Sequence, residues 1–114
     1  MARRLTTSRQ IDNYVASVIA DASHHAPQVE DVILPLSNAV RARLGPADTI
    51  EVYERNGVVA RTCWVRIAGA RYCFSYDYTT HVINLRDRGL QGNLRFAFDN
   101  TTTAAQIRAQ VAAL

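Results

Sequence analysis

The chain has 114 residues, of which 48% are hydrophobic and 20% charged, a composition typical of one globular domain. A chain of this length buries roughly two-thirds of its unfolded surface, so it can form a core without disulfides or a structural metal. All 13 basic residues are arginine, and the formal charge is +3. Acidic residues separate the arginines, which excludes a basic arm for nucleic acid. A coding bias explains the arginine-only usage as well as selection for anion contacts does.

The N-terminus and the cysteines indicate a cytoplasmic protein. Polar residues 6–10 stand where a signal peptide has about 7 to 15 apolar residues. The longest strongly apolar segment, Val32 to Leu36, is far shorter than the ~18 residues of a membrane span. Cys63 and Cys73 alone make neither a disulfide framework nor a metal site.

Two helices are predicted in the first part of the chain. Apolar residues from Ile11 to Ala22 share one helical face, and Thr7 and Gln10 have capping-box spacing, which predicts a helix over 8–23. A second apolar face from Val29 to Leu44 predicts a helix over 28–44, with Pro27 at an early position. Pro35 lies opposite that face, so we expect a solvent-side kink there.

Strands at 49–55 and 58–67 follow, because the apolar period changes from 3.6 to 2. Asn56-Gly57 predicts a two-residue hairpin turn that pairs Tyr53 with Ala60 and Ile50 with Cys63. One face of this hairpin carries Val65 and Ile67, and the other carries Tyr53, Trp64 and Arg66.

A strand at 71–78 carries four aromatic residues at i+2 spacing: Tyr72, Phe74, Tyr76 and Tyr78. An even-length turn around Gly69 places them on the face of Val65 and separates the two cysteines. An odd-length turn places them beside Trp64 and sets Cys63 opposite Cys73. The sequence leaves both open.

Strands at 81–86 and 94–98 are predicted next, joined by a mobile loop with Gly89 and Gly92. Thr103 and Gln106 have capping-box spacing at the start of a last helix over 103–114. The predicted fold is a single two-layer α+β domain: an N-terminal helical hairpin, an antiparallel meander of four to five strands and a short C-terminal helix.

The aromatic strand is the most concentrated chemical feature. The helices cover it, or it faces solvent and stacks bases, or it lines a small-molecule pocket under the helices. We favour a non-enzymatic binding module whose groove is lined by Tyr14, Trp64, Tyr72, Phe74 and Tyr76. The ligand is then a small molecule or a protein.

The alternative is a small RNA-acting protein that uses Arg66, Arg71, His81, Arg86 and Arg88. The order of helices and meander, with the segment Arg71 to Arg88, resembles the small RelE-type ribonuclease toxins, although the strand expected before the helices is missing. An RNA binder must gather these arginines on one patch, whereas pairing with Glu51, Glu54 and Asp87 would argue against that function.

No cofactor or metal is predicted. The sequence lacks phosphate-binding, dinucleotide-binding and zinc-protease motifs. Asp21 and His25 have the i, i+4 spacing of metal ligands, but adjacent histidines such as His24 and His25 point in different directions.

Exposed apolar residues indicate a contact surface. Leu34 lies off the main apolar stripe of its helix, and Val58 and Trp64 share a sheet face that the helices leave uncovered. A symmetric homodimer is the simplest assembly that covers such residues.

The build of the whole chain resembles the small orphan α+β proteins carried on mobile integron gene cassettes. The resemblance rests on the capped helix at Thr7 to Ser23, the turns at Asn56-Gly57 and Ala68-Gly69, and the terminal helix. It implies a mobile accessory gene of a class that is mostly of unknown function and often encodes dimeric or ligand-binding proteins, and it transfers no catalytic residue.

Overall fold

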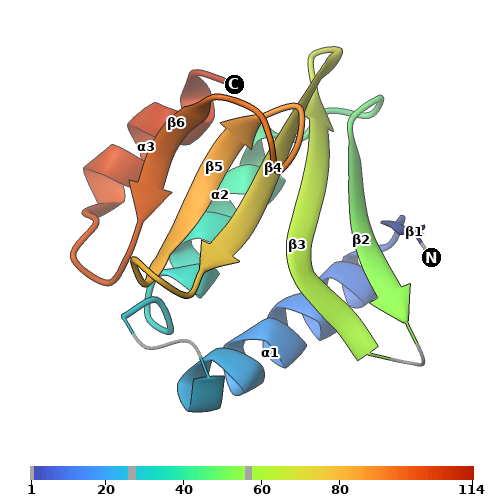
Figure 1. Cartoon of the computed structure of the whole chain (residues 1–114). Coiled ribbons are helices and arrows are strands. Elements are labelled where there is room, and N and C mark those ends of the chain that lie inside the picture. The colour runs from blue at the N-terminus through green and yellow to red at the C-terminus, as the bar shows by residue number, and fades with distance from the viewer. Residues whose placement is uncertain (1, 26–27, 56–57) are drawn as a thin grey trace.

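One six-stranded antiparallel sheet with three helices makes up the computed structural model, which describes residues 2–25, 28–55 and 58–114 (Figure 1). Neighbouring strands follow the order of the chain. The α+β class, the helical pair, the meander and the C-terminal helix are as predicted, and the sheet has one strand more. The elements are β1 (Ala2–Leu5), α1 (Ser8–His25), α2 (Ile33–Arg43), β2 (Thr49–Arg55), β3 (Val58–Ile67), β4 (Ala70–Asp77), β5 (Val82–Asp87), β6 (Leu94–Phe98) and α3 (Ala104–Ala112).

Capping boxes start α1 and α3 as the sequence predicts. The Gln10 backbone N–H donates to the Thr7 hydroxyl at 3.1 Å, and the Thr7 N–H donates back to the Gln10 side chain. Thr103 and Gln106 form the same reciprocal pair. Each pair satisfies N–H groups that have no partner inside the helix. The helix ends are therefore set by local hydrogen bonds that the sequence encodes.

The second helix begins later than predicted, at Ile33 rather than at residue 28. Pro35 then falls in the first turn, where a backbone N–H has no intrahelical partner and proline costs nothing. The expected kink is absent for this reason, since Pro35 marks the beginning of the helix. The described residues before it form turns tied to the segment before α3, through the Asn100 N–H donating to the Gln28 carbonyl at 2.7 Å. Pro27 lies outside the described residues.

The strand before the helices, β1, was not predicted. Its sequence Ala-Arg-Arg-Leu has no clear apolar alternation. It pairs antiparallel with β2, and Leu5, opposite Ile50, is its buried residue. Two arginines on a short edge strand also hinder pairing with other chains.

The β2–β3 hairpin has the predicted faces but not the predicted register along its whole length. Arg55 pairs with Val58, as a two-residue turn requires, whereas Ile50 pairs with Val65 rather than with Cys63. An irregularity between Val52 and Glu54 shifts the register by two residues, which keeps Ile50, Cys63 and Val65 on their predicted face. The Asn56-Gly57 turn itself lies outside the described residues.

The β3–β4 turn resolves the alternatives that the sequence left open. Ile67 pairs with Ala70, so the turn consists of Ala68 and Gly69, both with positive φ, as in a type I′ turn. Tyr72 therefore lies opposite Val65. Cys63 and Cys73 project to opposite faces and are free thiols.

Helices cover one face of the sheet and leave the other open (Figure 1). The core lies between the layers, and its fully buried residues include Val52, Val65, Leu85 and Phe98. Tyr72 and Phe74 belong to this covered face, so the aromatic strand faces the helices. In the described part of the chain, no helix has the length and apolarity needed to cross a membrane.

Candidate functional site

A cavity of about 110 Å³ lies between α1, α2 and the covered face of the sheet. Tyr14, Val15 and Val18 of α1 form one wall, and residues of α2 such as Ile33 and Leu36 form the other. The strands contribute the floor, mainly through Cys63, Val65, Phe74 and Tyr76. The lining is predominantly apolar, as in sites for small organic ligands.

A fork in the sheet accompanies this cavity. The hydrogen-bonded ladder between β3 and β4 ends at Thr62 and Ser75, although β3 extends further, to Val58. Below that point β3 bends away from β4 and stays paired with β2, as Figure 1 shows. Tyr76, one residue beyond the last pair, lines the cavity at this fork. The bend follows from the register shift, because extra residues in one strand increase its twist.

Tyr14 of the α1 wall and Cys63 of the floor form a polar pair in the cavity. The Tyr14 hydroxyl and the Cys63 thiol face each other closely enough to influence each other's ionisation. Burial raises the pKa of Cys63 to about 12, and burial together with Cys63 raises the pKa of Tyr14 well above its usual value. Both groups are therefore neutral at pH 7, and the floor favours an uncharged ligand.

Charged residues lie at the rim instead. Asp21 of α1 and Arg41 of α2 line the cavity, and both are half-buried. The Arg41 guanidinium is held by the carboxylate of Asp12 on α1. This ion pair bridges the two helices, so the cavity has an apolar interior and a charged rim between α1 and α2.

Three of the five residues predicted for the groove line the cavity: Tyr14, Phe74 and Tyr76. Tyr72 is buried on the same face but lies outside the lining, where the Arg95 guanidinium stacks on its ring at 5.4 Å. Trp64 lies on the open face, because it alternates with Cys63 and Val65 along β3. Cys63 was missed, and the sequence signal that identifies it is this same alternation.

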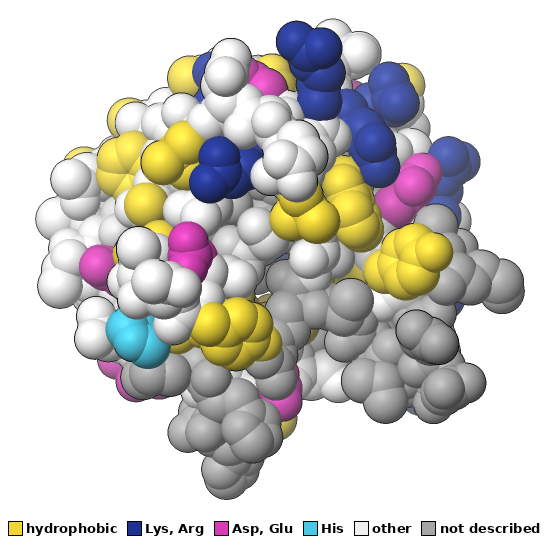
Figure 2. All heavy atoms as spheres, viewed as in Figure 1, with side chains coloured by type: hydrophobic (Ala, Val, Ile, Leu, Met, Phe, Trp, Pro, Cys, Tyr) yellow, Lys and Arg dark blue, Asp and Glu magenta, His cyan; other side chains and the backbone are white. Residues whose placement is uncertain are grey.

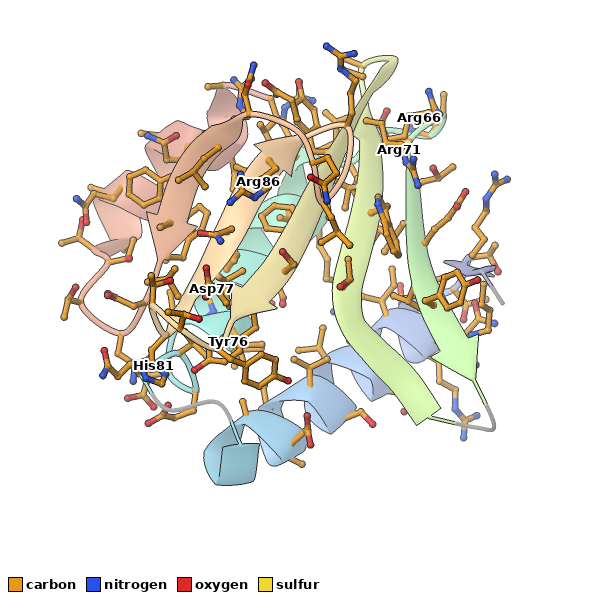
Figure 3. The ribbon with its side chains drawn as sticks, in the orientation of Figure 1. Arg66, Arg71, Tyr76, Asp77, His81 and Arg86 are labelled. Atoms are coloured by element: carbon orange, nitrogen blue, oxygen red, sulfur yellow. The ribbon has the colours of Figure 1, made fainter. Side chains whose placement is uncertain are left out.

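The structure does not bring together the residues predicted for RNA cleavage. His81 follows β4, where its ring is 3.0 Å from the Tyr76 hydroxyl oxygen. Arg86 lies towards the other end of β5, and its guanidinium donates to the Gly92 carbonyl. Figure 3 shows this separation of His81 from Arg86. Arg88 is exposed beyond the strand end, and its N–H donates to the Arg71 carbonyl.

Arg66 and Arg71 lie directly opposite each other on the open face, near the β3–β4 turn (Figure 3). The acids named as their potential partners act elsewhere: Glu51 pairs with Arg4 at 3.5 Å and Asp87 with Arg95 at 2.9 Å. The side chain of Glu54 lies outside the described residues.

Metal ligands are not clustered among the residues that the structure describes, where no group of three or more His, Cys, Asp or Glu side chains could hold an ion. The side chains of His24 and His25 lie outside that part.

Comparison with known proteins gives one family. A family model described as "Integron cassette protein VCH_CASS1 chain" matches residues 11–108, from the first helix into the last. No curated protein matches the sequence. The strand β1 lies before the matched region.

Proposed function

The chain belongs to the integron cassette protein family whose model covers residues 11–108, and we propose that it is a non-enzymatic binding protein for a small, uncharged organic molecule. The cavity between α1, α2 and the sheet is the observation that carries this proposal. Its volume of about 110 Å³ is somewhat below the ~150 Å³ of an engineered apolar protein cavity that binds benzene.

The ligand class follows from the lining. Apolar walls favour a hydrocarbon or aromatic body, and the neutral Tyr14–Cys63 pair favours one hydroxyl or carbonyl group at its end. The charged lining residue Arg41 is engaged by Asp12 and so is not an unpaired cation that would favour an anionic ligand. Phenol and p-cresol are suitable probes, and benzoate is their charged counterpart.

Filling the cavity from either wall tests the proposal. We expect phenol to shift the amide resonances of cavity residues in a saturable way, with a Kd of about 1 mM, which is typical of a ligand with so few atoms. Val18→Phe on α1 and Ser37→Phe on α2 should each remove this binding. Ala16→Phe is the matched control, because it adds the same ring to an exposed position of α1.

Tyr14→Phe tests the polar end of the cavity. It should weaken phenol more than toluene, because only phenol loses a hydrogen-bonding partner. The proposal fails if the folded wild-type protein shows no saturable shifts with any neutral probe, or if both filled variants bind phenol as the wild type does. Urea unfolding of every variant verifies that it is folded.

We also propose a cytoplasmic location. Cys63 and Cys73 lie on opposite faces of the sheet, where they cannot bond to each other, and paired cysteines are the usual feature of secreted domains.

A further inference from the structure

The open face of the sheet carries a row of cross-strand neighbours that the cavity does not use. Glu51 of β2, Trp64 of β3, Cys73 of β4 and Arg86 of β5 follow one another across the strands. Arg66 and Arg71 form the adjacent pair, towards the β3–β4 turn. We call Arg66, Arg71, Arg86, Trp64 and Tyr53 the open-face cluster.

Arg66 and Arg71 place two like charges directly opposite each other. Like charges directly opposite each other on a sheet are destabilising. Within the described residues neither Arg66 nor Arg71 forms an ion pair; Glu51, on the same face, pairs with Arg4, whereas Asp87 lies on the face of Tyr72 and pairs with Arg95. Arg86 uses one nitrogen on the Gly92 carbonyl and keeps further donors. The open face thus carries Arg66 and Arg71 side by side near the turn and Arg86 apart from them on β5 (Figure 3).

Aromatic rings lie next to these cations. The Arg71 guanidinium is 5.5 Å from the centroid of the Trp64 ring, and the Tyr53 ring is 6.4 Å from Trp64 on its other side. Tyr53 is 48% exposed. In Figure 2, dark blue side chains gather along one edge of this face and hydrophobic side chains lie directly beneath them. Trp64 is half-buried, with Gly89 of the β5–β6 loop near its ring nitrogen, so Tyr53 is the more accessible ring. Cations beside aromatic rings form the combination that holds phosphates and stacks bases.

We propose that the open-face cluster binds single-stranded nucleic acid. Arg66, Arg71 and Arg86 contact phosphates, and Tyr53 and Trp64 stack on bases. Charge complementarity favours this partner over a second copy of the chain, because the opposed arginines would meet arginines across a two-fold axis. A sheet face also offers no helix to enter the major groove of a duplex, which favours a single strand.

The single tryptophan provides the direct measurement. Trp64 is the only tryptophan of the sequence, so its fluorescence reports on the open face alone. We expect oligo(U) or oligo(dT) of about 12 nucleotides to quench it at low salt. The logarithm of the affinity should fall with the logarithm of salt concentration with a slope of about −2, which corresponds to three phosphate contacts.

Variants separate the phosphate contacts from the stacking. Arg71→Gln and Arg86→Gln should each weaken binding about tenfold and reduce the magnitude of the salt slope by about 0.7. Tyr53→Ala should weaken binding about tenfold and leave the slope unchanged. Arg108→Gln on α3 is the matched control, since it removes an exposed arginine from a helix. Circular dichroism verifies the fold of each variant.

Four results would overturn the proposal. The first is a lack of quenching at low salt, and the second is an Arg108→Gln effect as large as that of Arg71→Gln. The third is equal competition by inorganic polyphosphate, which carries the charge without bases. The fourth is a wild-type dimer that Arg71→Gln dissociates, which would assign the face to a second copy. None of these results depends on whether phenol binds in the cavity.

Discussion

Asp48 shows how one side chain joins two elements. One of its carboxylate oxygens accepts the Gly45 N–H at 2.7 Å after α2, and the other accepts the Ala68 N–H at 3.1 Å in the β3–β4 turn. These hydrogen bonds, that from Gly45 first, lower the pKa of Asp48 below its usual value of 3.8, and Arg43 adds to the effect. The carboxylate thus fixes the end of the helical pair to the sheet.

Asp48→Asn should destabilise the protein at neutral pH and much less in acid. Because the folded-state pKa is lowered, the stabilisation is present above the unfolded pKa of about 3.8 and is lost as the pH falls through the folded value. The gap between wild-type and variant urea midpoints should therefore be large at pH 7 and shrink towards pH 2. Asp77 and Asp99, whose pKa values are also lowered, contribute equally to both proteins.

Asp31→Asn serves as the control for this comparison, because it removes a charge from an exposed residue before α2. A gap for Asp48→Asn that stays constant over the whole pH range would contradict the assigned role of the carboxylate.

At the residue scale, the alternation of side chains along a strand explains which predicted cavity residues line the cavity and which do not. Phe74 and Tyr76 reach the cavity because they share a face with Val65, a relation that the sequence restricts to two alternatives. Trp64, one position from Val65, could not share that groove. Which arginines lack a carboxylate partner could not be predicted, since ion pairs such as Arg95–Asp87 depend on a bulge between β5 and β6.

Whole elements were predicted well where local hydrogen bonds define them. Capping residues and alternation place α1, α3, β2, β3 and β6 within a residue or two, and β4 and β5 each shift by one position. The start of α2 was wrong because apolar spacing continues through turns that precede the helix. β1 was missed because it has four residues and only one of them, Leu5, is a buried apolar residue. Such a segment forms a strand by pairing with β2 and shows no apolar alternation of its own.

Thr103→Ala should cost about 1 kcal/mol of stability, because it removes the hydroxyl that accepts the Gln106 N–H in the capping box of α3. The urea midpoint should fall while the slope m stays unchanged. Thr103→Ser keeps the hydroxyl and should stay within a few tenths of a kcal/mol of the wild type. Equal losses in both variants would show that the methyl group, rather than the cap, matters.

At the scale of the whole molecule, the order of elements and the two layers follow from the sequence. The sequence does not show which face of the sheet holds the cavity and which carries the open-face cluster. Alternation says which residues share a face. The shape of the cavity depends on the fork between β3 and β4, which arises from backbone geometry near Tyr53. No periodicity in the sequence encodes that geometry.

The homodimer stays a prediction. Because we assign the open face to nucleic acid, the dimer contact should lie on another part of the surface. Leu34, 50% exposed on α2, is the candidate outside the sheet. Light scattering at ~100 μM, well above the Kd of a modest interface, should give a dimer. Leu34→Glu should give a monomer, whereas Leu90→Glu, which changes an equally exposed residue of the β5–β6 loop, should not. A wild-type monomer would refute the dimer.

The fork between β3 and β4 also divides the molecule mechanically. In the described part of the chain no ladder pairs join β3 and β4 beyond Thr62 and Ser75, so the end of the β2–β3 hairpin forms an arm beside α1. Residues of α1, α2 and both strands meet around the cavity. An occupant of the cavity would touch Cys63, at the base of the arm, and Phe74 and Tyr76 of β4 at once, and so would bridge the two strands where they separate. The stiffness of this small protein would then depend on what it carries.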